Sequence, residues 1–279
     1  MASTTPDAGF GRDTGNSNAD TSEDKDGSIR AISRGLRVLQ AINRGGSITM
    51  MQICRQAEIP YPTACRVIET LIKEGMVERE PARKRYRATA LVRTLSVGFQ
   101  DEDALVAVAR PHIVALCHKH GWPISIATRV GHSMMVRDST HKLTSLTFHY
   151  YAPGYTLPII ECSTGKAYLA FCDEDERASI LSGLKRIDGP AERLAGLLLH
   201  DDTMLSAIRA KGYAMQARNS YTAVPGKTSS IAVPLFKGEQ ICGSLALIFF
   251  AAAMPMARAE TMFADDLRAT ADAISADLR

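Results

Sequence analysis

The spacing of apolar residues between residues 48 and 89 is helical at first and then becomes strand-like. Ile53 and Ala57 lie four apart, so they would share one face of a short helix that the hydroxyl of Thr49 can cap. Glu58-Ile59-Pro60 ends this helix, because a proline disfavours helical geometry in the residue before it. A short helix followed by a tight turn is therefore predicted.

A second helix is predicted from Tyr61 to Lys73, and Gly75 is the expected residue just beyond its end. Its apolar residues fall at helical spacing and form one stripe: Ala64, Val67, Ile68 and Leu71. Two short strands are predicted next, at residues 76–80 and 84–89, joined by a basic turn. The order helix, turn, helix and hairpin is that of a winged helix-turn-helix.

In such folds the first turns of the second helix meet base edges in the major groove of DNA. Basic side chains on the hairpin lie where phosphates run. The predicted DNA contacts are Tyr61, Pro62, Thr63, Cys65 and Arg66 on the helix, and Arg83, Lys84, Arg85 and Arg87 on the hairpin. Protein-docking modules and RNA-binding winged helices share this order of elements and are the alternatives for this region.

The N-terminal flank divides into a polar tail and a helix. Residues 1–28 have almost nothing to bury, so a disordered tail is predicted. The helix is predicted from Ile29 to Asn43. Four of its apolar residues are expected to face inward: Ile32, Leu36, Leu39 and Ile42. The winged helix-turn-helix domain would then span residues 29–89.

After the hairpin, helices predicted at 91–99 and 101–120 form a linker region, residues 90–121. From residue 122 the pattern mixes strands and helices without a regular βαβ alternation. Strands are predicted at residues 125–130, 133–139, 143–151, 213–218, 229–235 and 241–249. Helices are predicted at residues 164–171, 173–181, 201–211 and 255–278. An antiparallel sheet with helices packed on it, an α+β domain over residues 122–279, is the class that this order favours.

Charge divides the chain into three parts. Residues 1–28 carry two Lys/Arg and six Asp/Glu, residues 29–95 carry 13 and five, and residues 96–279 carry 18 and 19. Only the middle region is strongly basic, so a polyanionic partner is expected there.

Cysteine usage and hydropathy point to a cytoplasmic protein. The six cysteines form no C-x-x-C pair and no dense disulfide framework. The N-terminus lacks the basic start and apolar core of a signal peptide. The longest uncharged apolar run, residues 241–254, has 14 residues, whereas a membrane-spanning helix needs about 20.

Catalytic motifs are not found in the second domain. Ser163-Thr164-Gly165-Lys166 resembles part of a phosphate-binding loop, but Ala167 replaces the required Ser or Thr. Neither G-x-S-x-G nor H-E-x-x-H occurs, and no ligand spacing predicts a metal site. No enzymatic activity and no cofactor are therefore predicted. The Ser163–Thr164 pair opens a predicted helix, where free N–H groups suit a carboxylate, although either hydroxyl could simply cap that helix.

The sequence resembles the IclR family of bacterial transcriptional regulators. The resemblance rests on R-G-L-R-V-L-Q-A-I at 34–42, I-P-Y-P-T-A-C-R-V-I-E-T-L-I-K-E-G-M-V at 59–77, L-P-I-I-E-C-S-T-G-K-A-Y-L-A-F at 157–171 and S-S-I-A-V-P-L-F at 229–236. Within the family it looks closest to activators of phenylpropionate and related aromatic-acid catabolism, on T-H-K-L-T-S-L-T-F-H at 140–149 and L-A-F-C at 169–172. The resemblance implies a GAF/PAS-like effector-binding domain at the C-terminal end.

The resemblance also implies where the effector binds. The family holds effector carboxylates on backbone amides of the loop at Ser163 and Thr164, and Ser230 matches a pocket position. Where many members have Ser, this chain has Ala246 and Ile248, which favours an aromatic or longer acid over a small polar one. The further pocket candidates are Leu157, His149, Tyr155 and Asn219.

The prediction is a ligand-responsive DNA-binding regulator of a catabolic operon, with activation favoured over repression by the resemblance. Its expected partners are double-stranded operator DNA, an organic acid, a second copy of itself and RNA polymerase, but no membrane. Two half-sites favour a homodimer, and the resemblance alone implies tetramers. The alternatives are an enzyme whose winged helix docks proteins, and a nonspecific nucleic-acid-binding protein.

Overall fold

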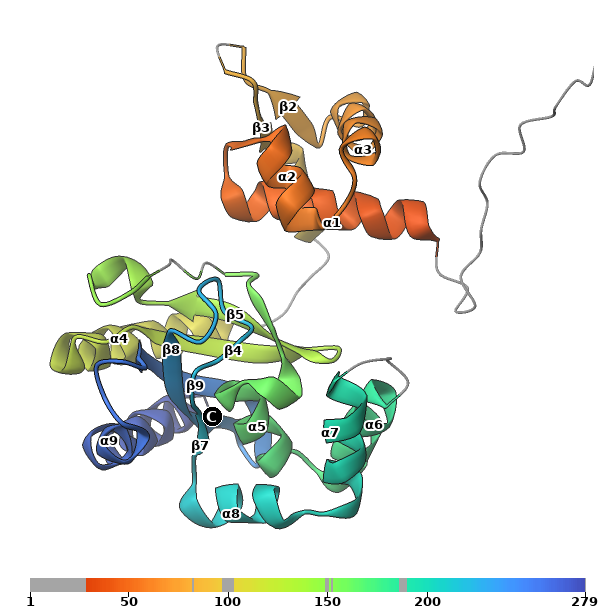
Figure 1. The fold of residues 1–279 in the computed structure, drawn as a ribbon. Helices are drawn as coiled ribbons and strands as arrows, with labels where there is room; N and C mark the ends of the chain where they lie inside the picture. Colours follow the sequence, from red (N-terminus) through yellow and green to blue (C-terminus); the bar gives the residue numbers. More distant parts are fainter. Residues whose placement is uncertain are drawn as a thin grey trace, which may run out of the picture. The chain divides into compact units, whose positions relative to one another are not determined.

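A computed structural model describes residues 29–81, 83–96, 103–148, 151, 153–185 and 190–278. The chain divides into two compact units, residues 1–96 and residues 97–279. Figure 1 shows the elements of each unit.

The first unit is a three-helix core with a small antiparallel sheet. Its elements are α1 (Arg30–Gly45), β1 (Ile48–Thr49), α2 (Met50–Ala57), α3 (Tyr61–Lys73), β2 (Val77–Arg79), β3 (Arg85–Ala88) and the 3-10 helix η1 (Ala90–Ser96). The strand order is β1-β3-β2. Strand β3 thus lies between β2, its partner in the hairpin, and β1, a short strand that the pattern did not predict. The winged helix-turn-helix is confirmed.

Local chemistry sets the ends of the helices. Thr49 caps α2 through a capping box, in which its side chain accepts from the amide of Gln52 and its own amide donates to the side chain of Gln52. Helix α3 covers the predicted residues, and Gly75 beyond it has a positive φ of 72°. In the turn between α2 and α3, Glu58 adopts a left-handed conformation.

The first turns of α1 differ from the prediction. Val38, Leu39 and Ile42 are buried in the core of the first unit, but Ile32 and Leu36 are 58% and 54% exposed. The expected inward stripe is therefore wrong over its N-terminal half. Among the described residues, no residue of α1 before Val38 belongs to this core, which α1 shares with α2 and α3.

The second unit is built on a six-stranded antiparallel sheet in the order β6-β5-β4-β9-β8-β7. The strands are β4 (Ile124–Val130), β5 (Ser133–Ser139), β6 (Thr156–Pro158), β7 (Ala214–Gln216), β8 (Thr228–Lys237) and β9 (Gln240–Phe250). The predicted hairpin turn is present between β4 and β5, where Gly131 has a φ of 58°. The central pair, β4 and β9, runs in register from Ile124–Leu247 to Ala127–Ser244.

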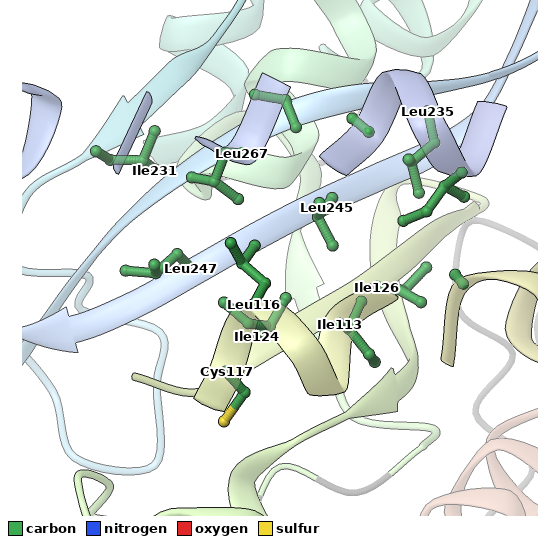
Figure 2. Close-up of a cluster of buried hydrophobic side chains, with 14 of the residues drawn as sticks. Ile113, Leu116, Cys117, Ile124, Ile126, Ile231, Leu235, Leu245, Leu247 and Leu267 are labelled. Carbon is green, nitrogen blue, oxygen red and sulfur yellow. The ribbon is translucent and has the colours of Figure 1, made fainter. Parts of the chain in front are cut away.

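Helices cover both faces of this sheet (Figure 1). One face carries α4 (Asp103–His120) and α9 (Met256–Asp277), and the other carries α5 (Ser163–Phe171), α6 (Glu174–Leu184), α7 (Pro190–His200) and α8 (Thr203–Lys211). Figure 2 shows the core under α4 and α9, where Ile113 and Leu116 meet Ile124, Leu245 and Leu247. The region predicted as a linker, residues 90–121, is thus divided between η1 of the first unit and α4 of the second.

Two parts of the second unit differ from the prediction. The strand expected at residues 143–151 is wrong: His141–Leu143 form a 3-10 turn, and no strand follows among the described residues of that segment. The edge of β5 pairs instead with β6, from Met135–Thr156 to Ser133–Pro158. Helix α7, which the pattern did not predict, packs its buried Ala195 and Leu198 in the cluster around α5.

Candidate functional site

A cavity lies between the sheet and the N-terminal end of α5. Its empty volume is about 580 Å³, including the part that opens to solvent. The lining is Ser125, Ala127, Met134, Val136, His141, Tyr151, Leu157, Cys162, Ser163, Thr164, Asn219, Thr222, Thr228, Ser230, Ala246 and Ile248. A mainly apolar hollow with a few converging polar groups is the usual form of a small-molecule site.

Side-chain size explains why the hollow forms on this face. Successive residues of a strand point to opposite faces of its sheet. Along β9, Leu245 and Leu247 fill the core under α4 and α9, whereas Ala246 between them faces α5. On β4 the residues that face α5 are Ser125 and Ala127. Because these side chains are short, the sheet and α5 leave space between them.

Helix α5 begins at this cavity, and its start is fixed by two tight contacts. Cys162 is the N-cap, and its Sγ accepts a hydrogen bond from the amide of Gly165 at 3.3 Å. Burial raises the pKa of the Cys162 thiol, so the group stays neutral. A Cβ at Gly165 would lie 1.8 Å from the carbonyl oxygen of Ile159, so only glycine allows this approach. The alternative in which Ser163 or Thr164 caps the helix is wrong.

The two hydroxyls therefore serve other contacts. Ser163 Oγ and Ser230 Oγ lie 2.7 Å apart and bridge α5 to β8. Thr164 Oγ1 lies 3.3 Å from Cys162 Sγ, and the buried Ser244 on β9 donates to the carbonyl of Thr164 at 2.9 Å. The amides of Ser163 and Thr164 occupy the first two helical positions, where a helix supplies no carbonyl partners. Those amides and the helix dipole favour an anion at this end of the cavity.

The opposite wall comes from two residues that the sequence did not single out as pocket residues. His141 and Tyr151 line it, and their rings lie edge-on with centroids 4.9 Å apart. The Tyr151 hydroxyl accepts a hydrogen bond from the amide of Ala223 at 3.2 Å, and burial raises the pKa of Tyr151. Nearby, the Tyr155 hydroxyl donates to the carbonyl of Tyr221 at 3.1 Å. These bonds hold two segments distant in sequence against each other beside the cavity.

The predicted effector residues divide into three groups. Six of them line the cavity: Leu157, Ser163, Thr164, Asn219, Ser230 and Ala246. Tyr155 is not among the lining residues and instead supports Tyr151, with ring centroids 4.7 Å apart. His149 lies outside the described residues. The cavity brings together predicted residues from four separate stretches, namely 157–164, Asn219, Ser230 and Ala246, but their role in binding stays a prediction.

The candidate nucleic-acid interface is the outer face of α3. Ala64 and Ile68 bury its inner face, whereas Tyr61, Pro62 and Arg66 are exposed and Thr63 and Cys65 are partly so. Pro60 precedes the first helical residue in an extended conformation, which places these five side chains on the first one and a half turns.

The basic hairpin divides into free and engaged side chains. Arg83 and Lys84 are exposed at its tip, with no ion pair among the described residues. Arg85 donates to the carbonyl of Ser47 at 2.8 Å, and Arg87 forms an ion pair with its cross-strand neighbour Glu78. Arg85 therefore ties β3 to β1, while the pair at Arg87 is exposed and is worth little in water.

Within the described parts of the chain, no group of three His, Cys, Asp or Glu side chains is placed to hold a metal ion. No described helix is both long enough and apolar enough to span a membrane.

Two family models match the chain. The model described as the bacterial transcriptional regulator IclR C-terminal matches residues 100–276, which contain the sheet, α5 and the cavity. The MarR family model matches residues 36–88, which contain α2, α3 and the hairpin.

Relatives and solved structures agree with these models. The chain is 25% identical over 162 residues to the HTH-type transcriptional regulator TsaQ1/TsaQ2 of Comamonas testosteroni, covering 57% of this chain and 58% of that relative. It is 26% identical over 192 residues to the acetate operon repressor of Salmonella typhimurium, covering 67% and 69%. A solved IclR homologue from Microbacterium hydrocarbonoxydans, complexed with 4-hydroxybenzoate, shares the fold with a TM-score of 0.59 at 22% identity, covering 89% of this chain and 99% of that one.

The IclR C-terminal model spans more than half of the chain. It matches a chain that has a winged helix-turn-helix, an antiparallel sheet with helices on both faces and a cavity at α5. The chain belongs to the IclR family of bacterial transcriptional regulators.

Proposed function

We propose that this regulator responds to an aromatic carboxylic acid, which binds in the cavity at α5 and changes its action on operator DNA. The observation that carries the proposal is the pairing of Ser163 and Ser230 beside the first amides of α5, in a cavity whose remaining walls are largely apolar. The helix end suits the carboxylate, and the apolar walls suit a ring.

The apolar residues on β9 support an aromatic ligand over a small polar acid. Ala246 offers no hydrogen bond, and Ile248 adds apolar surface to the same wall. A short polar acid would leave this surface in contact with water, which costs free energy in proportion to the area. The 4-hydroxybenzoate complex of the Microbacterium hydrocarbonoxydans homologue is in keeping with this ligand class.

Residues 29–89 would bind the operator as part of a homodimer, since two half-sites multiply sequence selectivity. Arg66 would contact a base edge, while Arg83 and Lys84 would contact phosphates, because all three are exposed. We favour activation in the presence of the acid, through contact with RNA polymerase, on the resemblance to activators of aromatic-acid catabolism. A reconstituted transcription assay with and without the acid gives the sign directly.

The test is a binding titration of the full chain on its own upstream intergenic DNA, at two salt concentrations, with and without a panel of aromatic acids. Tight, sequence-selective binding that one acid alters supports the proposal. Weak binding that depends only on salt, without any acid effect, would contradict it. The second unit would then be assayed for turnover of the same acids.

Two variants assign the parts of the site. Arg66→Ala should cost about 1–3 kcal/mol of operator affinity and relax the sequence preference, because a base contact is lost. Lys73→Ala removes the same charge from the exposed last turn of α3 and is the matched control.

Ser230→Leu should abolish the acid response by filling the cavity while operator binding stays intact. Unchanged acid titration in this variant would show that the effector binds elsewhere.

A further inference from the structure

The cavity has polar groups at two opposite walls and a mainly apolar surface between them. One wall is the start of α5, with Ser163 and its partner Ser230. The other holds His141, which is 1% exposed, and Tyr151, whose ring contacts it edge-on. Between the two walls, β4 and β9 contribute Ser125, Ala127, Ala246 and Ile248, and Met134, Val136 and Leu157 on β5 and β6 add apolar surface beside them.

Strand register places these walls far apart. Ser230 on β8 pairs with Ile248 on β9, and the amide of Ile248 donates to the carbonyl of Pro123, just before β4. The amide of Thr140, just after β5, donates to the carbonyl of Ile124 at 2.9 Å, so the next residue, His141, lies at the same level of the sheet. Three strand spacings separate β8 from β5, roughly 14 Å along the sheet.

This arrangement selects the shape of a ligand. A carboxylate at α5 leaves the rest of the molecule to cross the apolar middle, which suits a phenyl ring on a short chain. At its far end the ligand meets an imidazole, which carries at least one N–H donor in any protonation state and an acceptor nitrogen when neutral. A group that fits this wall is one that can both accept and donate a hydrogen bond.

A hydroxyl on the ring fits better than a second carboxylate. Among the described lining residues none is Lys or Arg, so a second negative charge at this wall would be desolvated without a fixed cation. A phenolic hydroxyl is neutral and both accepts and donates. Tyr151 is held in place by Ala223 and keeps its ring against His141, which fixes the imidazole for this contact.

We propose that His141 is the specificity residue of this regulator and hydrogen-bonds a hydroxyl at the distal end of the effector, so that the effector class is a para-hydroxylated phenylalkanoic acid. The inference rests on the proposed function, because it concerns the same cavity. It adds the residue that distinguishes the hydroxylated acid from the acid that lacks the hydroxyl.

The test compares 3-(4-hydroxyphenyl)propionate with 3-phenylpropionate by calorimetric titration into the full chain. Wild-type protein should bind the hydroxylated acid at least about tenfold more tightly, because the partner of a buried polar group is missing from the other acid. In His141→Phe the ring remains and the hydrogen bond is lost, so the ratio of the two Kd values should fall to about one. His118→Phe, an exposed position on α4, is the control and should keep the wild-type ratio.

Equal affinity of the wild-type protein for the two acids would overturn the assignment of His141, and this outcome needs no variant to fold. An unchanged ratio in folded His141→Phe would overturn it as well. If the wild-type protein binds neither acid, nor any other aromatic acid of the panel, the proposed function itself fails. The two failures are thus distinguishable.

Discussion

Gly165 is the residue on which the shape of the cavity depends most directly. The close approach of Ile159 to its Cα lets the start of α5 reach the sheet, where Ser163 meets Ser230. Any side chain at position 165 would displace the first turn of the helix from the segment before it. Glycine is thus required here by the close contact with Ile159 and not by the helix, which would be more stable with alanine.

We therefore expect Gly165→Ala to lower the free energy of unfolding by at least about 2 kcal/mol, because the new methyl group overlaps a backbone carbonyl that cannot move freely. Thermal unfolding of the full chain measures the change, and acid titration should show weakened binding. Gly196→Ala, in α7, meets no atom within 4 Å and should be neutral or stabilising by about 0.5–1 kcal/mol. Equal effects of the two substitutions would contradict the contact.

At the scale of the element, the order of helices and turns in the first unit is set by short-range chemistry. Thr49 and Gln52 satisfy each other's amides at the start of α2, and a proline sets the start of α3. Such signals act within four residues, so the sequence predicts them well. The chain between Thr49 and Gly75 accordingly folds as its pattern indicates.

Loss of the capping box should be visible in α2 alone. We expect Thr49→Ala to lower the opening free energy of the α2 amides by about 1 kcal/mol, because the amide of Gln52 at the helix start loses its hydrogen-bond acceptor. Hydrogen exchange on the full chain measures this quantity by segment. Thr70→Ala is the control, since that exposed hydroxyl donates to the Arg66 carbonyl within its own helix, α3. Faster exchange of the α2 amides in Thr70→Ala would argue against the cap. Unchanged exchange of these amides in Thr49→Ala would do so as well.

At the scale of the whole second unit, α4 and α9 are joined by charged groups above their shared apolar core. Asp266 on α9 accepts from Lys119 at 2.7 Å and lies 2.8 Å from His120, both on α4. The hydrogen bond from Lys119, followed by that from His120, lowers the pKa of Asp266 below its ordinary value of 3.8. A carboxyl with a lowered pKa stabilises the fold above 3.8, and this contribution is lost as the pH falls through the folded-state value.

Asp266→Asn should accordingly lower the Tm at neutral pH, and the gap between variant and wild type should close as the pH falls below 3.8. Asp272→Asn changes the same charge on the exposed side of α9 and should have little effect at any pH. Thermal unfolding followed across this range checks both. A gap that stays constant down to low pH would mean that packing, not charge, accounts for the effect of Asp266.

Much of the fold followed from local pattern. The helix of residues 61–73, the hairpin at Gly131 and the long apolar strands β8 and β9 each carry their signal within one segment. Motif resemblance added the loop at Ser163 and the strand at Ser230, which the structure brings to one cavity. These features are determined by the sequence because spacing, turn residues and caps act over a few neighbouring residues.

Tertiary structure decided the rest. The segment at 143–151 reads as a strand, but β6 occupies the edge of β5 that it would need. The first turns of α1 carry apolar residues that no described part of the core covers, and nothing in their spacing reveals this. His141 lines the same cavity as Ser230 because the register of β5, β4, β9 and β8 brings the end of β5 level with that serine. Contacts across a sheet join residues that are distant in sequence, so local periodicity does not encode which side chains complete the site.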